Sequence, residues 1–198
     1  MELTISELHG RGSVIPLTIT ETPTLTNTIS ALSLENSSKN TSSSNNPFLS
    51  KWDFRWIRMA EEVKTWSKDP NKKVGCVLVK GKRDIAKGYN GFPEKLSDDL
   101  SRLKNPEFKD KVIIHAEKNA IYHALDFGIP VRGCTAYITY HPCARCASML
   151  IEVGIQKIVC PSPKPAPPKW EQDFALSSDI LYEAGVLVLY YIPEVSPL

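Results

Sequence analysis

The chain has 198 residues, enough for one compact domain of ordinary size or for one domain with a tail. Its formal net charge is +2 and 42% of its residues are hydrophobic, which is typical of a globular protein without a strong field for nucleic acid. No run of about 18 apolar residues occurs, so the sequence excludes a transmembrane helix.

Charge and cysteine content indicate the kind of ligand and the redox environment of the protein. Residues 1–50 hold two basic and four acidic residues, a net charge of −2, whereas the remainder holds 22 basic and 18 acidic residues, a net charge of +4. This weak positive charge suits an anionic small molecule better than a duplex. The cysteine count is five, an odd number, and no secretory signal is expected. We therefore expect a reducing, cytoplasmic location and a metal-binding or catalytic use of thiols.

The first quarter of the chain differs from the rest in composition. Residues 1–50 contain 23 Ser, Thr or Asn residues, including the run NSSKNTSSSNN. A segment with so few apolar side chains cannot offset the entropy lost on ordering. We therefore expect residues 1–49 to be a disordered tail and residues 50–193 to be the folded domain.

The first predicted elements of the domain are a helix and two strands. Apolar residues recur at spacings of three and four and predict an amphipathic helix with its tryptophans in the core or a subunit interface: Trp52, Trp56, Met59, Ala60, Val63 and Trp66. Pro70 ends this helix. Strands are expected at 74–80 and 84–90, joined by a tight turn, and a polar loop with room for a short helix at 94–111.

Helices and strands alternate after residue 115. The expected elements are a helix at 115–127, a strand at 134–140, a helix at 143–153, a strand at 156–160, a proline-rich loop at 161–168, a helix at 170–184 and a strand at 186–191. Right-handed crossovers between such strands predict an α/β fold with a mostly parallel sheet and helices on both faces. Ligands of such sheets bind where strands end and helices begin.

Two predicted helix starts carry residues with metal chemistry. His115, Ala116 and Glu117 open one helix, and a P-C-x-x-C run with Cys143 and Cys146 opens the next. Cysteines three residues apart share a helix face, and two thiolates with one imidazole form a set of ligands suited to Zn²⁺. Three protein ligands leave one coordination position open, which is the pattern of a catalytic zinc site.

Glu117 is the candidate acid–base group, because a carboxylate in the first turn would face the same small volume as His115. Two other interpretations of C-x-x-C remain open at this point. A redox dithiol would need neither His115 nor Glu117, and a structural zinc site would need a fourth ligand, for which His141 is nearest. The other three cysteines, Cys76, Cys134 and Cys160, are expected to be buried as small apolar side chains.

The motif H-x-E followed by P-C-x-x-C resembles the signature of zinc-dependent nucleobase deaminases. The wider pattern resembles the deoxycytidylate (dCMP) deaminase family over roughly residues 50–190. It is carried by SKDPNKKVGCVLV (67–79), GYNGFP (88–93), SDD (97–99), HAEKNAIYHA (115–124) and GCTAYITYHPCARCASMLIEVGIQKIV (133–159). The resemblance implies a three-layer α/β/α cytidine-deaminase-like fold, with a five-stranded mixed sheet and helices on both faces.

The resemblance also implies a reaction: hydrolytic deamination of dCMP to dUMP and ammonia, which feeds dTMP synthesis. One Zn²⁺ per chain, held by His115, Cys143 and Cys146, would supply the hydroxide, and Glu117 would shuttle the protons. The implied substrate contacts are Asn90 to the sugar, the Ala116 amide to the pyrimidine carbonyl, the backbone near Tyr140 and His141 to the amino group, Ser67 and Lys68 to the phosphate, and Trp170 by stacking. Asn90 also suits a plain tight turn, and Lys68 a solvated surface.

Members of this family are often homo-oligomers, so a hexamer or a dimer is expected. The candidate effectors are dCTP and dTTP. Neither nucleic acid nor a membrane is expected as a partner. Two alternatives remain. One is a deaminase of the same fold acting on dCTP, CMP or a tRNA adenosine. The other is a non-catalytic structural zinc protein. A tRNA enzyme should carry a clustered basic surface, which a net charge of +4 spread over residues 51–198 does not favour.

Overall fold

The computed structural model describes residues 47–193, and the statements below concern that part of the chain. The predicted disordered tail falls almost entirely on residues 1–46, outside the described residues, and stays a prediction. Leu49, at its end, is buried in the hydrophobic core.

The described elements follow the predicted order closely. They are α2 (Lys51–Thr65), β1 (Gly75–Lys80), β2 (Arg83–Tyr89), α3 (Leu100–Leu103), α4 (Pro106–Val112), α5 (Ala116–Asp126), β3 (Thr135–Ile138), α6 (Ala144–Glu152), β4 (Lys157–Pro161), the 3₁₀ turn η1 (Pro168–Trp170), α7 (Glu171–Glu183) and β5 (Leu187–Tyr191). None of these helices is long and apolar enough to cross a membrane. The loop predicted at 94–111 contains two short helices, α3 and α4, whose N-termini are capped by Asp99 and Asn105.

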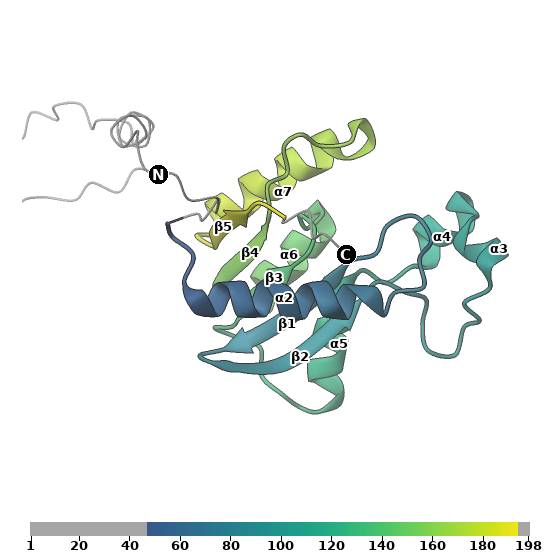
Figure 1. Ribbon diagram of the computed structural model, residues 1–198. Helices are drawn as coiled ribbons and strands as arrows, with labels where there is room; N and C mark the ends of the chain where they lie inside the picture. The colour runs from purple at the N-terminus through teal and green to yellow at the C-terminus, as the bar shows by residue number, and fades with distance from the viewer. Residues whose placement is uncertain (1–46, 194–198) are drawn as a thin grey trace, which may run out of the picture. The chain divides into compact units, whose positions relative to one another are not determined.

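The five strands form one mixed sheet in the order β2-β1-β3-β4-β5 (Figure 1). Strand β1 is antiparallel to both of its neighbours, with Leu78 opposite Ala86 on β2 and Ala136 on β3. Strands β3, β4 and β5 are parallel and are connected through helices. The five-stranded mixed sheet implied by the family resemblance is confirmed. The mostly parallel sheet expected from the crossovers is not found in residues 47–193: two of the four strand pairs are antiparallel, because β1 and β2 form a hairpin and β1 runs opposite to β3.

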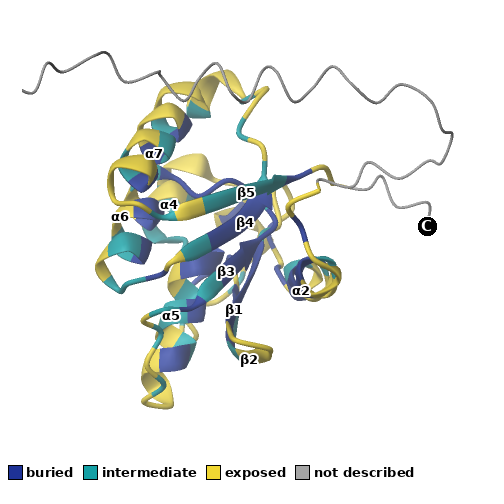
Figure 2. Cartoon of the chain, turned by 90° about the vertical axis from the view of Figure 1, so that its left-hand side faces the viewer, coloured by how far each residue is buried: buried dark blue, intermediate teal, exposed yellow. Residues whose placement is uncertain are grey.

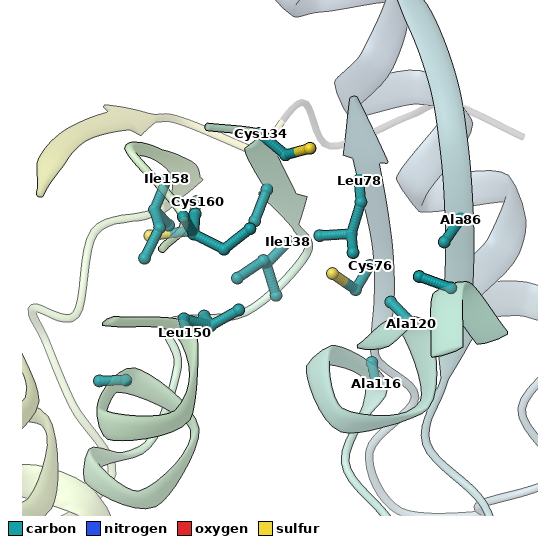
Figure 3. Close-up of a cluster of buried hydrophobic side chains, with 14 of the residues drawn as sticks. Cys76, Leu78, Ala86, Ala116, Ala120, Cys134, Ile138, Leu150, Ile158 and Cys160 are labelled. Carbon is teal, nitrogen blue, oxygen red and sulfur yellow. The ribbon is translucent and has the colours of Figure 1, made fainter. Parts of the chain in front are cut away.

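Helices cover both faces of the sheet. Along β1, Val77 and Val79 pack toward α2, whereas Cys76 and Leu78 join the core on the opposite face. Figure 2 shows α2 on one side of the sheet and α5, α6 and α7 on the other. Figure 3 shows the larger cluster, in which the three non-motif cysteines are buried, as predicted. The alternation of the strand side chains therefore builds a three-layer α/β/α fold.

Helix α2 begins at a capping box formed by Ser50 and Asp53. Its buried face includes Trp56, but Trp52 is 38% exposed and Trp66 is 49% exposed. Of the two predicted locations, the core of this chain therefore holds Trp56 alone among the three, and a subunit interface stays a prediction for Trp52 and Trp66. The reason is the helical period, which places Trp52 and Trp66 at the margins of the stripe that faces the sheet.

Candidate metal centre and pocket

The first half of the site lies at the N-terminus of α5, where His115 occupies the N-cap position. This helix end approaches strand β2 closely at Gly88. A Cβ atom on residue 88 would lie 2.5 Å from the carbonyl oxygen of Ala116 and would also overlap the backbone of Ala120. Only glycine allows this approach, so Gly88 sets the position of the helix end that carries His115 and Glu117.

The second half lies at the N-terminus of α6, directly after β3. Cys143 is the N-cap residue of α6 and Cys146 lies in its first turn. Strand β3 is central in the sheet and helix α5 packs beside it, so the chain brings residues 28 and 31 positions apart into contact. Both helices direct their N-terminal N–H groups toward the cluster, and this field favours negative charge there.

The three predicted metal ligands form one cluster. His115 Nδ1 lies 3.5 Å from Cys143 Sγ and 3.5 Å from Cys146 Sγ, and all three ligand atoms lie within 4.8 Å of one another. A tetrahedral zinc ion, with bonds of about 2.3 Å to sulfur and about 2.0–2.1 Å to nitrogen, separates such ligand atoms by about 3.6 Å. The observed spacing and donor types therefore fit one Zn²⁺ ion.

The electrostatics of the two cysteines support a cation. A hydrogen bond from Cys146, aided by His115, lowers the pKa of the Cys143 thiol to about 4 against the effect of burial. The hydrogen bond to Cys143 raises the pKa of Cys146, and burial raises it further. Without a metal, the two cysteines together therefore carry one negative charge: Cys143 is a thiolate and Cys146 keeps its proton. Two thiolates at this place require a compensating positive charge, as zinc provides.

Glu117 lies beside the cluster and is 4% exposed. Burial raises the pKa of its carboxyl to about 7, against the opposing effects of nearby His115 and of hydrogen bonds from its own backbone and from Cys146. A carboxyl whose pKa is near neutrality both accepts and returns a proton at ordinary pH.

His141 does not join the metal cluster. Its ring is buried, with Nδ1 3.7 Å from Cys160 Sγ and Nε2 3.4 Å from the Ser178 hydroxyl. Burial lowers the pKa of this imidazole to about 4, so the ring is neutral at pH 7. Among the described residues, no fourth protein ligand therefore completes the cluster, which argues against the structural zinc site considered from the sequence.

A pocket of about 450 Å³ opens onto the cluster. Of the predicted substrate contacts, five line it: Asn90, Ala116, Tyr140, His141 and Trp170. Trp170 stacks on Phe174 at 5.7 Å, and Phe174 meets Tyr140 edge to face at 5.5 Å. The lining of the pocket therefore combines an aromatic cluster of Tyr140, Phe174 and Trp170 with the start of α5, which carries Glu117.

Asn90 lines the pocket but its amide is already engaged by the protein. Its Nδ2 donates to the Lys72 carbonyl and to Asp69 Oδ2, and its Oδ1 accepts from the Val74 N–H at 2.8 Å. The side chain therefore ties the loop at 69–74 to the end of β2. Both N–H groups of its amide are occupied, so Asn90 has no free donor for a ligand, but Oδ1 can accept one further hydrogen bond.

Ser67 and Lys68 do not line the pocket. Ser67 is buried and donates to the backbone carbonyl of Asn90, while the exposed Lys68 pairs with Asp98 at 2.8 Å. Three other lysines line the pocket, and the sequence reasoning missed them: Lys72, Lys109 and Lys169. Lys72 lies in the run PNKK (70–73), which does not indicate the direction of a side chain, and no motif marks Lys109 or Lys169.

The charges at the pocket mouth are unequal. Lys109 pairs with the buried Asp69 at 3.0 Å, and Lys169 pairs with Asp110 at 2.7 Å. Lys72 takes part in no ion pair found within residues 47–193, and its Nζ lies 3.8 Å from the centroid of the Tyr140 ring. The mouth therefore presents one ammonium group that has no carboxylate partner in this part of the chain.

Comparisons with known proteins agree with this geometry. A family model described as the cytidine and deoxycytidylate deaminase zinc-binding region matches residues 50–162. An uncharacterized deaminase from the luxG 3' region of Aliivibrio fischeri is 37% identical over 143 residues, 72% of this chain and 95% of that protein. Deoxycytidylate deaminase of Homo sapiens is 34% identical over 137 residues, 66% of this chain and 74% of the human protein.

A solved structure shares the fold. The dCMP deaminase of cyanophage S-TIM5, in apo form, matches with a TM-score of 0.57 and 24% sequence identity, covering 70% of this chain and 96% of the phage chain. At this identity the likeness concerns the arrangement of helices and strands.

Proposed function

This chain belongs to the cytidine and deoxycytidylate deaminase family of zinc-dependent hydrolases, and we propose that it deaminates dCMP to dUMP and ammonia. The observation that carries the proposal is the cluster of His115, Cys143 and Cys146 at the floor of a pocket, with the buried carboxyl of Glu117 beside it. The family and the zinc cofactor agree with the expectations from the sequence.

The three clustered side chains would hold the metal. A Zn²⁺ ion with three protein ligands supplies, when bound, Lewis acidity that lowers the pKa of a water molecule in its open position. Glu117 acts on protons: in our proposal it takes one proton from the attacking water and delivers it to N3 of the pyrimidine. It then takes the second proton, from the new hydroxyl on C4, and delivers it to the amino group, which leaves as ammonia when the C4–N bond breaks. Its burial excludes competing solvent from this transfer.

The remaining pocket residues orient the base. The aromatic cluster of Tyr140, Phe174 and Trp170 offers apolar surface to a planar ring. Ala116 is the first residue of α5, so its N–H has no partner within the helix and suits the pyrimidine 2-carbonyl. Asn90 would accept from a sugar hydroxyl.

Lys72 supports a phosphorylated substrate over a free nucleoside. Its ammonium lies at the mouth of the pocket without a carboxylate partner among the described residues, and a phosphate placed there would form a charge-assisted hydrogen bond. We expect Lys72→Met to raise KM for dCMP about tenfold or more while changing activity on deoxycytidine little, because such a bond contributes about 1.5–3 kcal/mol.

A matched control is the neighbouring lysine. Lys73 is exposed, does not line the pocket and donates to the Thr65 carbonyl at 3.4 Å, so Lys73→Met should leave KM unchanged. Equal effects of the two substitutions would contradict the phosphate role of Lys72. The earlier assignment of the phosphate to Ser67 and Lys68 stays a prediction, and Lys68→Met tests it in the same assay.

The substrate itself is tested by offering dCMP, dCTP, CMP, deoxycytidine and adenosine side by side to protein of known zinc content and measuring ammonia release. We expect selective turnover of dCMP. We further propose a cytoplasmic homo-oligomer whose product feeds dTMP synthesis, with dCTP and dTTP as effectors. Selective turnover of another substrate in the panel would contradict the dCMP proposal.

A further inference from the structure

The backbone on both sides of Cys143 is held by helix α7. The hydroxyl of Ser177 donates to the carbonyl oxygen of Pro142 at 2.7 Å, and the N–H of Ala144 donates to Asp173 Oδ2 at 3.0 Å. The first bond fixes the peptide group that precedes Cys143, and the second fixes the peptide group that follows it. Because φ and ψ of Cys143 lie between these two planes, α7 determines the direction of its side chain.

The two holding residues form one face of α7. Asp173 and Ser177 are four residues apart, so they lie one above the other on the helix. The adjacent residues Phe174 and Ser178 contact the ring of His141, which lies in the segment just before Cys143, between β3 and α6. Figure 1 shows α7 beside α6, the helix that this turn begins. Helix α7 therefore contacts the whole segment from His141 to Ala144 through hydrogen bonds and ring packing.

Asp173 accepts from the first N–H of α6, one of the four N–H groups that have no partner within a helix. Helix N-caps are usually Ser, Thr, Asp or Asn, whose side chains accept from the first N–H groups of the helix. In α6 the N-cap is Cys143, whose side chain makes no capping hydrogen bond and whose sulfur faces His115 instead. The Asp173 carboxylate from α7 instead places an acceptor and a negative charge at the positive end of α6.

We propose that Asp173, assisted by Ser177, is a positioning residue for the metal centre. It fixes the backbone at Cys143 so that the sulfur stays 3.5 Å from His115 Nδ1, ready to share a cation with Cys146. This inference rests on the zinc ligands of the proposed function, and it adds two residues that belong neither to the metal cluster nor to the lining of the pocket. Loss of such supporting contacts weakens metal binding by about 10- to 100-fold in comparable sites.

The test measures zinc affinity of the full chain without substrate, by competition with a chromophoric chelator. We expect Asp173→Ala to raise the zinc dissociation constant about 10- to 100-fold. Asp173→Asn should stay within about threefold of the wild type, because its amide oxygen still accepts from Ala144. The exposed Asp179 lies on the same helix, so Asp179→Ala removes the same charge and should leave zinc affinity unchanged.

The result that overturns the proposal is an Asp173→Ala protein that binds zinc as tightly as the wild type, or an Asp179→Ala protein weakened to the same extent. Should Asp173→Ala not fold, Ser177→Ala replaces it: several-fold weaker zinc binding is expected and unchanged binding overturns the proposal. Because no substrate is present, failure of the dCMP assay leaves this test intact. A wild-type chain that binds no zinc would instead overturn the ligand assignment.

Discussion

Asp53 holds helix α2 on the sheet, and its replacement by asparagine gives a quantitative test of the fold. The buried carboxylate accepts from the Tyr137 hydroxyl at 2.8 Å and from Lys157 Nζ at 2.7 Å, on strands β3 and β4. It also accepts from the N–H and the hydroxyl of Ser50. In Asp53→Asn an NH₂ group would face some of these donors, which would then lose their acceptor.

The size of the effect follows from the pKa of this carboxyl. Burial alone would raise the pKa, but hydrogen bonds from Lys157, Ser50 and Tyr137 outweigh it and lower the pKa from 3.8 to about 2. Because each pKa unit corresponds to about 1.4 kcal/mol, the charged form is stabilised by about 2.5 kcal/mol in the folded state. Since the folded pKa is the lower one, this stability is present above pH 3.8 and is lost as pH falls toward 2.

The assay is urea unfolding of wild type and Asp53→Asn between pH 7 and pH 3. We expect the variant to be less stable by about 2.5 kcal/mol at pH 7, with the difference shrinking below about pH 4. Any contribution of bound zinc is common to both proteins and cancels. Glu62 is an exposed carboxylate on the same helix, so Glu62→Gln should change stability by no more than about 0.5 kcal/mol. A difference below about 1 kcal/mol at pH 7, or one that is independent of pH, would refute this reasoning.

Three further outcomes are expected. Gly88→Ala should displace the start of α5, which lowers the melting temperature and reduces kcat/KM by about tenfold or more. In the control Gly91→Ala the new Cβ meets only the Tyr89 ring at 3.8 Å, so neither quantity should fall. Equal effects of the two substitutions would contradict the packing argument. Cys146→Ser should reduce bound zinc well below one ion per chain, measured by metal analysis, and full retention would contradict the ligand assignment. Deleting residues 1–46 should leave kcat/KM within about twofold, and a large loss would show that the catalytic domain needs them.

The cluster of candidate zinc ligands was predictable because its residues occur in a local pattern that is typical of metal sites. His115 follows the β-bridge at Ile114 and is the N-cap residue of α5, and Cys143 follows β3 and is the N-cap residue of α6. Helices that begin at the carboxyl ends of neighbouring strands start close together, so these two residues meet. Glu117 follows from the same pattern, since a residue in the first turn faces the same volume. The alternating cores were predictable from the two-residue period of the strands.

Features that depend on contacts between distant residues were not predictable. The family resemblance implied phosphate contacts at Ser67 and Lys68, which do not line the pocket, whereas Lys72, further along the same loop, does line it. Spacing along the chain does not show where a loop side chain points. Likewise, nothing in the local sequence links Asp173 to Ala144, because that hydrogen bond joins two residues that are 29 positions apart and lie on different helices.

The stripe of tryptophans shows a limit of periodicity. Spacings of three and four identify α2, but they leave its rotation about the axis uncertain by part of a turn. In the structure the backbone at Ala60 and Lys64 approaches β1 at Gly75, where a Cβ atom would lie 2.2 Å from the Ala60 carbonyl oxygen. Trp56 therefore faces the sheet, while Trp52 and Trp66 are exposed at the margins.

The central claim is that Glu117, beside the zinc cluster, moves the protons that deaminate dCMP. The most direct measurement compares ammonia release from dCMP by wild type and by Glu117→Gln at equal zinc content. We predict steady turnover by the wild type and a loss of about 10²- to 10⁴-fold in the variant, with its fold and bound zinc unchanged. A Glu117→Gln protein as active as the wild type would contradict the proton transfer, and a zinc-loaded wild type inactive on dCMP would contradict the substrate.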